Sequence, residues 1–300
     1  MTQEIPLDYP DQGFRYKLYT PTPALTPFVG CYWTLQSARQ PLTQELMIPD
    51  GYVDIIFNYG NTYRRTELGP FQRTHWINES HIVGERTTSV VLDHTAHLNL
   101  VGIKLKAYGL WALTQLPSRD FAGQIVPIDV AMNALVSLEH QIHEASNDAG
   151  KIQIIEQFLL QHLLTFAEHH RDMQFGTQLV LQTHGNIRIK DLAATLNMSY
   201  RQLERSFQHF VGLSPKSFAR VVRFKKMMQT IKRNQLINHD HLYLDFGYYD
   251  QNHFIKEFKH FMGGTPSDYF NNQFHSEDIF FSLGIHNNVT AWLSGQSSDE

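Results

Sequence analysis

The pattern of apolar and polar positions divides the chain into a strand-like first part and a helical remainder. Up to about residue 125, short runs rich in β-branched and aromatic residues are separated by Pro, Gly and Asn, as is typical of strands. Four of these runs are YVDIIFNYG, HIVGE, SVVLDH and LNLVGIKLKAYG. We therefore predict a β-rich N-terminal domain built as a small barrel or sandwich, a shape that can enclose a small ligand.

Between about residues 127 and 168 the apolar period becomes helical. Two apolar stripes, separated by the polar segment 146–150, contain Val130, Ala134 and Leu138, then Ile152, Ile155, Leu159, Leu163 and Phe166. This pattern predicts an αα-hairpin that completes a first domain of residues 1–168. The apolar face of this hairpin fits two roles equally well: it could cover one face of the β domain, or it could form a dimer. Residues 167–174 are expected to connect this domain to the next.

The helical remainder repeats itself once. Leu203, Phe207, Phe210, Gly212, Ser214, Pro215 and Phe218 recur 51 positions later as Phe254, Phe258, Phe261, Gly263, Thr265, Pro266 and Tyr269. Upstream of these, Leu192 and Leu196 match Leu242 and Phe246 at an offset of 50. The second copy therefore has one additional residue, which is expected to lie in a turn.

Each copy predicts a helix, a short turn and a second helix. Ser199 is a good N-cap for a helix over 200–210, in which Leu203, Phe207 and Phe210 share one face. The turn before it needs a residue that tolerates a positive φ, and Asn197 fits because Asn often replaces Gly there. Gly247 occupies the matching place in the second copy, before a helix over 251–261.

With the apolar residues turned inward, both of these second helices present polar side chains. Arg, Gln and Asn can pair with base edges in a major groove, and Lys and Arg neutralise phosphates. A solvated surface would explain one such helix, but two copies in helix-turn-helix context favour DNA binding. The candidate base contacts are Tyr200, Arg201, Gln202, Glu204, Arg205, Gln251, Asn252, His253 and Lys256.

The same segment resembles a known family. DLAATLNMSYRQLERSFQHFVGLSPKSF, then RVVRFKKMMQTIKR and FGYYDQNHFIKEFKHFMGGTPSDYF, resemble the DNA-binding domain of the AraC/XylS family of bacterial transcription regulators. The resemblance covers about residues 173–272. It implies two helix-turn-helix units joined by one linker helix, with two recognition helices that enter successive major grooves. The whole chain is accordingly expected to be an α+β protein, with an all-α C-terminal domain.

Charge is distributed as such a function requires. The chain has a net charge of −4, but residues 171–274 carry 14 basic against 8 acidic side chains, whereas residues 1–170 carry 11 against 17. Positive charge thus gathers where phosphates would be bound. The candidate phosphate contacts are Arg188, Lys190, Ser199, Lys216, Arg220, Arg223, Lys225 and Lys226. The partners implied are double-stranded DNA and, as further candidates, a small-molecule effector, RNA polymerase and a second copy.

One residue departs from the helix-turn-helix pattern. Where the first copy has the small Ala193 in its first helix, the second has Tyr243. A phenol does not fit where a methyl group fits unless the neighbouring helix moves or the hydroxyl points outward. The second unit is therefore a candidate for different docking or weaker binding, and a partner-binding module that has lost DNA binding is one alternative function. Tyr248 and Tyr249 make this surface unusually aromatic.

The N-terminal part resembles a cupin-like domain. Residues 48–60, IPDGYVDIIFNYG, are similar to a pattern found in β-rich domains that precede this type of DNA-binding domain. A competing hypothesis is therefore a metal-dependent or acid-base enzyme with an accessory helix-turn-helix domain. It lacks support, because His94 and His97 do not have the His-x-His spacing of metal-binding cupins and would face opposite sides of a strand. We predict no metal, no cofactor and no catalytic residue.

Composition sets the remaining limits. An apolar fraction of 42% over 300 residues is enough for two domains with real cores. No run of about 18 apolar residues predicts a membrane span, and no signal peptide is recognisable, so we expect a cytoplasmic protein. Cys31 is the only cysteine and is expected to be a buried structural thiol. Residues 273–300 form a C-terminal extension whose end is expected to be disordered.

Overall fold

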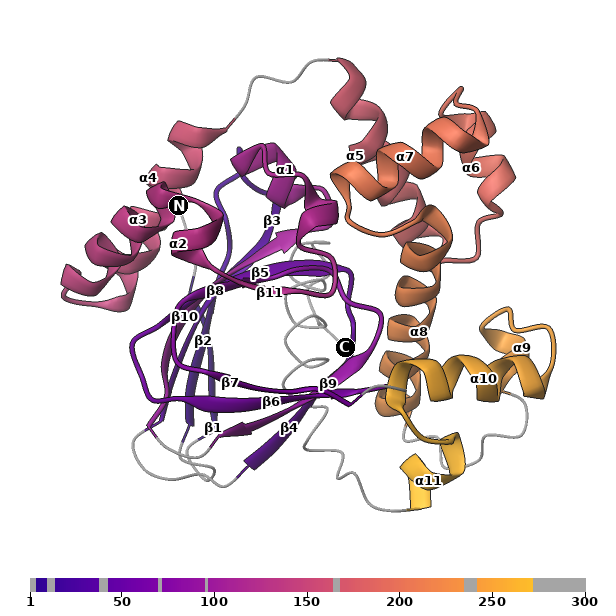
Figure 1. Cartoon of the computed structure of the whole chain (residues 1–300), viewed down its shortest axis with the longest axis horizontal. Coiled ribbons are helices and arrows are strands. Elements are labelled where there is room, and N and C mark those ends of the chain that lie inside the picture. Colours follow the sequence, from indigo (N-terminus) through magenta and orange to yellow (C-terminus); the bar gives the residue numbers. More distant parts are fainter. Residues whose placement is uncertain are drawn as a thin grey trace, which may run out of the picture.

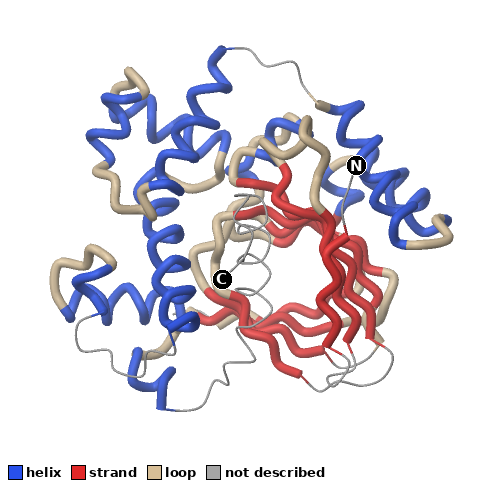
Figure 2. The backbone as a smooth tube through the Cα atoms, turned by 180° about the vertical axis from the view of Figure 1, so that it is seen from behind, coloured by secondary structure: helices blue, strands red, loops and turns tan. Residues whose placement is uncertain are grey.

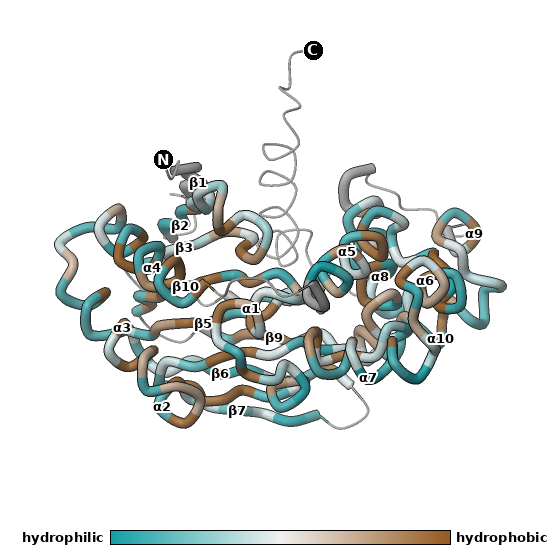
Figure 3. The backbone as a smooth tube through the Cα atoms, turned by 90° about the horizontal axis from the view of Figure 1, so that it is seen from above, coloured by the Kyte–Doolittle hydropathy of each residue, from teal (hydrophilic) through white to brown (hydrophobic). Residues whose placement is uncertain are grey.

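The computed structural model describes residues 4–9, 14–37, 43–69, 72–94, 97–163, 168–234 and 242–271. Strands gather in the first part of the chain and helices α5 to α11 in the second, with a smaller group of helices beside the strands (Figure 1). Seen from above, the β-rich part and the C-terminal helices lie side by side (Figure 3). The division predicted from the apolar pattern is therefore confirmed.

Eleven strands within the described ranges form two antiparallel sheets, ordered β1-β2-β3-β10-β5-β8-β11 and β4-β9-β6-β7. Their bounds are β1 (Glu4–Tyr9), β2 (Phe14–Tyr19), β3 (Val29–Ser37), β4 (Thr43–Met47), β5 (Tyr52–Asn58), β6 (Tyr63–Leu68), β7 (Thr74–Ile77), β8 (His81–Val83), β9 (Ser89–His94), β10 (Asn99–Lys106) and β11 (Ile125–Pro127). From behind, the strands curve around a common interior (Figure 2). The four predicted strand runs correspond to β5, β8, β9 and β10.

Strand β10 lies at the centre of the larger sheet, between β3 and β5. Val101, Ile103 and Leu105 alternate along it and belong to the large core that continues into the helices. On the opposite face, Gly102 pairs with Trp33, and a Cβ at this glycine would overlap the indole ring. Glycine is therefore needed here because the side chain of the neighbouring strand crosses over its backbone.

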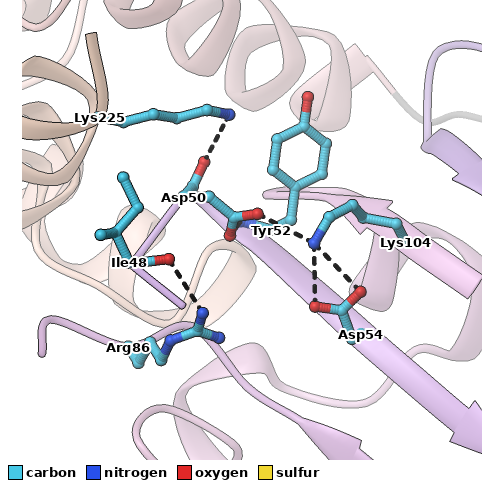
Figure 4. Close-up of polar contacts among 7 residues, drawn as sticks. All are labelled: Ile48, Asp50, Tyr52, Asp54, Arg86, Lys104 and Lys225. Carbon is cyan, nitrogen blue, oxygen red and sulfur yellow. Dashed lines mark hydrogen bonds and ion pairs between the residues drawn. The ribbon is translucent and has the colours of Figure 1, made fainter. Parts of the chain in front are cut away.

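A buried ionic cluster also lies on this face of the sheet. The Nζ of Lys104 is 2.9 Å from Oδ2 of Asp50 and 3.1 Å from Oδ2 of Asp54 (Figure 4). Asp54 is the register partner of Lys104 on β5, so sheet pairing itself brings the two charges together. All three side chains are less than a tenth exposed, and the attraction between them offsets the cost of removing each from water.

The predicted αα-hairpin is confirmed, with a different apolar stripe. Helices α1 (Gly109–Thr114), α2 (Ile128–Ala131), α3 (Asn133–Glu144) and α4 (Asp148–His162) follow β10, together with the short helix η2 (Ser118–Asp120). Val130, which the pattern placed on the apolar stripe, is 73% exposed. It lies in the one-turn helix α2, so the helical period of α3 does not extend back to it. The buried stripe consists of Leu135, Leu138, Ile142, Ile152, Ile155 and Leu159.

The hairpin packs on the β domain through a buried carboxylate. Glu156 of α4 accepts hydrogen bonds from the backbone N–H of Thr22 (2.7 Å) and from the hydroxyl of Tyr32 (3.3 Å). Of its two predicted roles, covering the β domain is therefore observed. The dimer role stays a prediction.

The C-terminal part contains seven helices among the described residues. They are α5 (Glu168–Gln182), α6 (Ile189–Thr195), α7 (Tyr200–Phe210), α8 (Pro215–Asn234), α9 (Leu242–Asp245), α10 (Gln251–Met262) and α11 (Pro266–Asn271). Of the segment 167–174, predicted to connect the two domains, the residues from Glu168 onward are helical and begin α5. Met173, Thr177 and Val180 are buried at helical spacing, and this burial stabilises a helix whose first residues are mainly polar. The predicted C-terminal extension, 273–300, lies outside the described residues.

We expect the buried cluster to contribute strongly to stability. Replacing Asp54 with Ala leaves Lys104 with one carboxylate, and removing one member of a buried ion pair costs about 3 kcal/mol. The free energy of unfolding, measured in urea by tryptophan fluorescence, should fall by that amount. Glu144→Ala, which removes an exposed carboxylate of α3, serves as control and should change it by less than about 0.5 kcal/mol. Equal stabilities of the two variants would contradict the role given to the cluster.

Candidate nucleic-acid interface

The first helix-turn-helix unit consists of α6, a four-residue turn and α7. Asn197, the second residue of this turn, has a positive φ of 52°, as predicted. The hydroxyl of Ser199 accepts a hydrogen bond from the backbone N–H of Gln202 (3.3 Å), and the backbone N–H of Ser199 donates to Oε1 of Gln202 (2.9 Å). This capping box confirms Ser199 as N-cap and fixes the start of α7.

Helix α7 has one buried apolar face and one exposed polar face. Leu203 and Phe207 are fully buried, while the candidate base contacts Tyr200, Arg201, Gln202 and Arg205 are exposed. Glu204 is half-buried. The side chain of Gln202 is already engaged by the cap through its Oε1, so in this conformation it offers a base only its amide nitrogen.

The second unit has the same plan with a longer turn. Gly247 has φ of 71°, which matches Asn197, and Asp250 caps α10 by accepting a hydrogen bond from the backbone N–H of His253 (2.7 Å). Phe254 and Phe258 are buried. The predicted base contacts Gln251, Asn252, His253 and Lys256 are all exposed on the other face. We call α7 and α10 the recognition helices.

Tyr243, the departure noted in the sequence, is half-buried at the margin of the second unit. Its carbonyl accepts a hydrogen bond from the backbone N–H of Tyr248 (2.9 Å), which closes the turn after α9. The corresponding Ala193 in the first unit is only 6% exposed. The larger side chain is thus accommodated by remaining partly at the surface.

Two of the predicted phosphate contacts on α8 instead join this helix to the second unit. The guanidinium of Arg220 forms two hydrogen bonds from Nε to the carboxylate of Glu257 on α10, at 2.8 and 2.9 Å. Arg223 donates to the carbonyl of Gly247 (3.2 Å) and lies over the ring of Tyr248. Both cations therefore have partners within the protein, which sequence reasoning did not find because these partners lie outside α8.

Lys225 also has partners within the protein. Its Nζ donates to the backbone carbonyl of Asp50 (3.2 Å) and lies 4.6 Å from the ring centre of Tyr52, so it reaches from α8 into the N-terminal domain (Figure 4). Burial lowers the pKa of Lys225 to about 8, although Asp50 acts in the opposite direction. A phosphate contact by Lys225 would require the two parts of the chain to separate.

The remaining predicted phosphate contacts occupy accessible places. Arg188, Lys190, Ser199 and Lys216 are exposed, and Lys226 is half-buried. Lys216 lies in the first turn of the linker helix α8, where backbone N–H groups also favour an anion. The basic surface available for phosphates is therefore smaller than the sequence predicted.

The N-terminal domain touches the C-terminal end of each recognition helix. At α7, the hydroxyl of Ser118 donates to the carbonyl of Phe210 (3.0 Å), and the rings of Trp111 and Phe210 meet edge to face at 5.0 Å. At α10, the hydroxyl of Ser89 lies 3.2 Å from the sulfur of Met262. We call these contacts, together with those of Lys225, the domain junction.

Buried acids and bases of the N-terminal domain lie close to the domain junction, where Glu85 acts electrostatically on Lys225. The carboxyl of Glu85 is 1% exposed, and burial, reinforced by Asp50, raises its pKa well above the usual value. Beside it, Arg86 donates from Nη2 to the carbonyl of Ile48 (3.0 Å) (Figure 4). Ionisable groups so far from water make this part of the domain sensitive to changes in packing.

The histidines and the single cysteine of the N-terminal domain are dispersed. Among the described residues, no group of three or more His, Cys, Asp or Glu side chains is placed to hold a metal ion. His81 is buried between the hydroxyl of Tyr63 (3.1 Å) and the carbonyl of Glu79 (2.8 Å), and burial lowers its pKa to about 4. The thiol of Cys31 is buried, as predicted, and burial raises its pKa to about 12. No helix in the described ranges is long and apolar enough to span a membrane.

Comparison with known proteins gives two family matches. Residues 192–272 match a family described as a helix-turn-helix domain, and residues 17–127 match a domain of unknown function (DUF6597). A curated relative, an uncharacterised helix-turn-helix-type transcriptional regulator of Haemophilus influenzae, is 30% identical over 116 residues. This match covers 38% of the chain and 39% of the relative, so the chain spans well under half of that protein.

Solved structures show remote similarity. The crystal structure of ToxT from Vibrio cholerae has a TM-score of 0.42 at 12% identity, over 80% of this chain and 98% of ToxT. The AraC-like transcriptional activator CuxR has a TM-score of 0.32 at 11% identity, over 76% of this chain and 86% of CuxR.

We expect the domain junction to become more stable as pH rises above about 8. While α8 is docked, Lys225 loses its proton near pH 8, whereas after separation its pKa returns to about 10.5, so the docked state binds fewer protons between these values. Relative to a Lys225→Met variant, the wild type should gain about 1 kcal/mol of unfolding free energy between pH 7.5 and 9.5. Urea unfolding of both proteins at the two pH values measures this, and a difference that does not change with pH would contradict it.

Proposed function

We propose that the C-terminal domain of this chain is a helix-turn-helix domain of the AraC type and that the whole protein is a sequence-specific regulator of transcription. The observation that carries the proposal is the pair of recognition helices, α7 and α10, each capped at its start and each displaying polar side chains. A helix N-terminus that presents Arg, Gln and Asn side chains suits the edges of base pairs in a major groove.

The two recognition helices act on one duplex because α8 joins them rigidly. Phe218 of α8 packs against Phe207 of the first unit, and Phe224 stacks on Phe261 of the second, with ring centres 4.3 Å apart. The ion pair between Arg220 and Glu257 adds a directional bond to this packing. We infer that the two helices enter successive major grooves on one side of the DNA.

The proposed DNA contacts are of two kinds, those to bases and those to phosphates. Arg201, Arg205, Gln251 and Asn252 contact bases, with Tyr200, Gln202, Glu204, His253 and Lys256 beside them on the same two surfaces. Arg188, Lys190 and Lys216 contact phosphates and fix the register of the protein on the duplex.

The N-terminal domain controls this binding through the domain junction. Because it contacts the ends of α7 and α10 and the middle of α8, a change in its structure alters how both recognition helices are held. A small-molecule effector, a second copy of the chain or RNA polymerase supplies such a signal. A protein that regulates bacterial transcription acts in the cytoplasm and needs no catalytic residue.

The proposal is tested by selecting binding sites for the full-length protein from random DNA duplexes, followed by sequencing and a salt series. We expect two short sequence blocks about one helical turn apart, or ~10–10.5 base pairs. A single block would contradict reading by both units. The absence of any enriched sequence would contradict the proposed function itself.

We expect base and phosphate contacts to respond differently to mutation. Arg205→Ala should cost about 1–3 kcal/mol on the selected DNA and relax the preference at one base pair. Lys216→Ala, the matched phosphate variant, should weaken binding to all sequences alike and reduce the salt dependence by about one counterion. Affinities measured on the selected duplex and on a scrambled duplex distinguish a base contact from a phosphate contact. If Arg205→Ala lost the same affinity on both duplexes, the assignment of Arg205 to a base would be refuted.

A further inference from the structure

The second unit differs from the first by one residue, and the structure identifies which one. Between the positive-φ residue and the N-cap, the first unit has only Met198, whereas the second has Tyr248 and Tyr249. Met198 is half-buried and packs against the core. Tyr248 is 3% exposed and stacks edge to face on Phe254, so it takes the packing role of Met198. The additional residue is therefore Tyr249.

The extra residue is presented to solvent. Tyr249 is 89% exposed, more than any other large apolar side chain in the described part of the protein. A single exposed aromatic is unremarkable in itself, but this one directly precedes Asp250, the N-cap of α10. Neither packing nor capping accounts for a tyrosine here, because Tyr248 and Asp250 already serve those purposes.

The backbone of Tyr249 is fixed relative to the recognition helix. Its N–H donates to Nδ1 of His253 (3.4 Å), and the N–H of His253 donates to the carboxylate of Asp250 (2.7 Å). These bonds link the turn to the first turn of α10, next to the exposed Gln251 and Asn252. The phenol is thus displayed at a defined place beside the surface proposed to contact bases.

From this arrangement, which rests on the proposed function, we propose that Tyr249 contacts the DNA backbone beside the second sequence block. In a helix-turn-helix unit, the turn and the start of the recognition helix approach the strand that borders the groove. A tyrosine hydroxyl donates a hydrogen bond to a phosphate oxygen without carrying a charge, and its ring covers the apolar face of a deoxyribose. The first unit, which lacks the extra residue, has no equivalent contact.

The test uses the full-length protein and the two-block DNA obtained by selection. Tyr249→Ala should weaken binding about tenfold, the lower end of the range for one hydrogen bond to a charged group, and Tyr249→Phe should lose most of the same factor. The salt dependence should stay unchanged in both variants, because a neutral donor releases no counterion. Trp76→Ala, which removes an exposed aromatic from β7, is the matched control and should bind like the wild type.

The position of the contact is measured by ethylating single phosphates. The wild type should lose affinity when one particular phosphate beside the second block is ethylated, and Tyr249→Phe should be insensitive to that ethylation. The proposal is overturned if both Tyr249 variants bind like the wild type, or if they lose affinity while every sensitive phosphate stays sensitive. If the wild type itself selects no sequence, the proposed function fails instead, so the two failures are distinguishable.

Discussion

Burial of the linker helix α8 (Pro215–Asn234) is the constraint on which the rest of the structure depends. Phe218, Phe224 and Met227 are fully buried although they point to different sides of this helix. A helix that is apolar on several sides must be covered on all of them. Here the first unit, the second unit and the N-terminal domain each cover one side, so none of the three can shift without exposing part of α8.

The same helix explains which site residues could be predicted from sequence and which could not. The starts of α7 and α10 follow from local chemistry: a capping residue, a positive-φ residue before it and apolar positions at helical spacing. The partners of Arg220, Arg223 and Lys225 lie 37, 24 and 175 residues away, where no local pattern reports them. From sequence alone, a basic residue on the linker helix is therefore assigned to a phosphate, because the partner that it has in the folded protein is not visible in the local pattern.

Within the N-terminal domain, the strands were predictable but their interior was not. Alternating apolar residues identify β5 and β10, yet the meeting of Lys104 with Asp54 depends on the register between strands that are 50 residues apart. The error at Val130 has a related cause. Val130 lies where one element ends and another begins, and there tertiary packing, not propensity, decides how far a helix extends.

The shared covering of α8 also bears on how the chain can be divided. The backbone of Gly51, with φ of 77°, lies so close to α8 that the position of its absent Cβ is 3.2 Å from the ring of Phe218. A C-terminal fragment produced alone would present this phenyl group to water, together with the rings at the end of α7 that Trp111 now covers. Such a fragment would carry an exposed apolar strip next to its basic surface. In a binding assay, its self-association would then be mistaken for affinity for DNA.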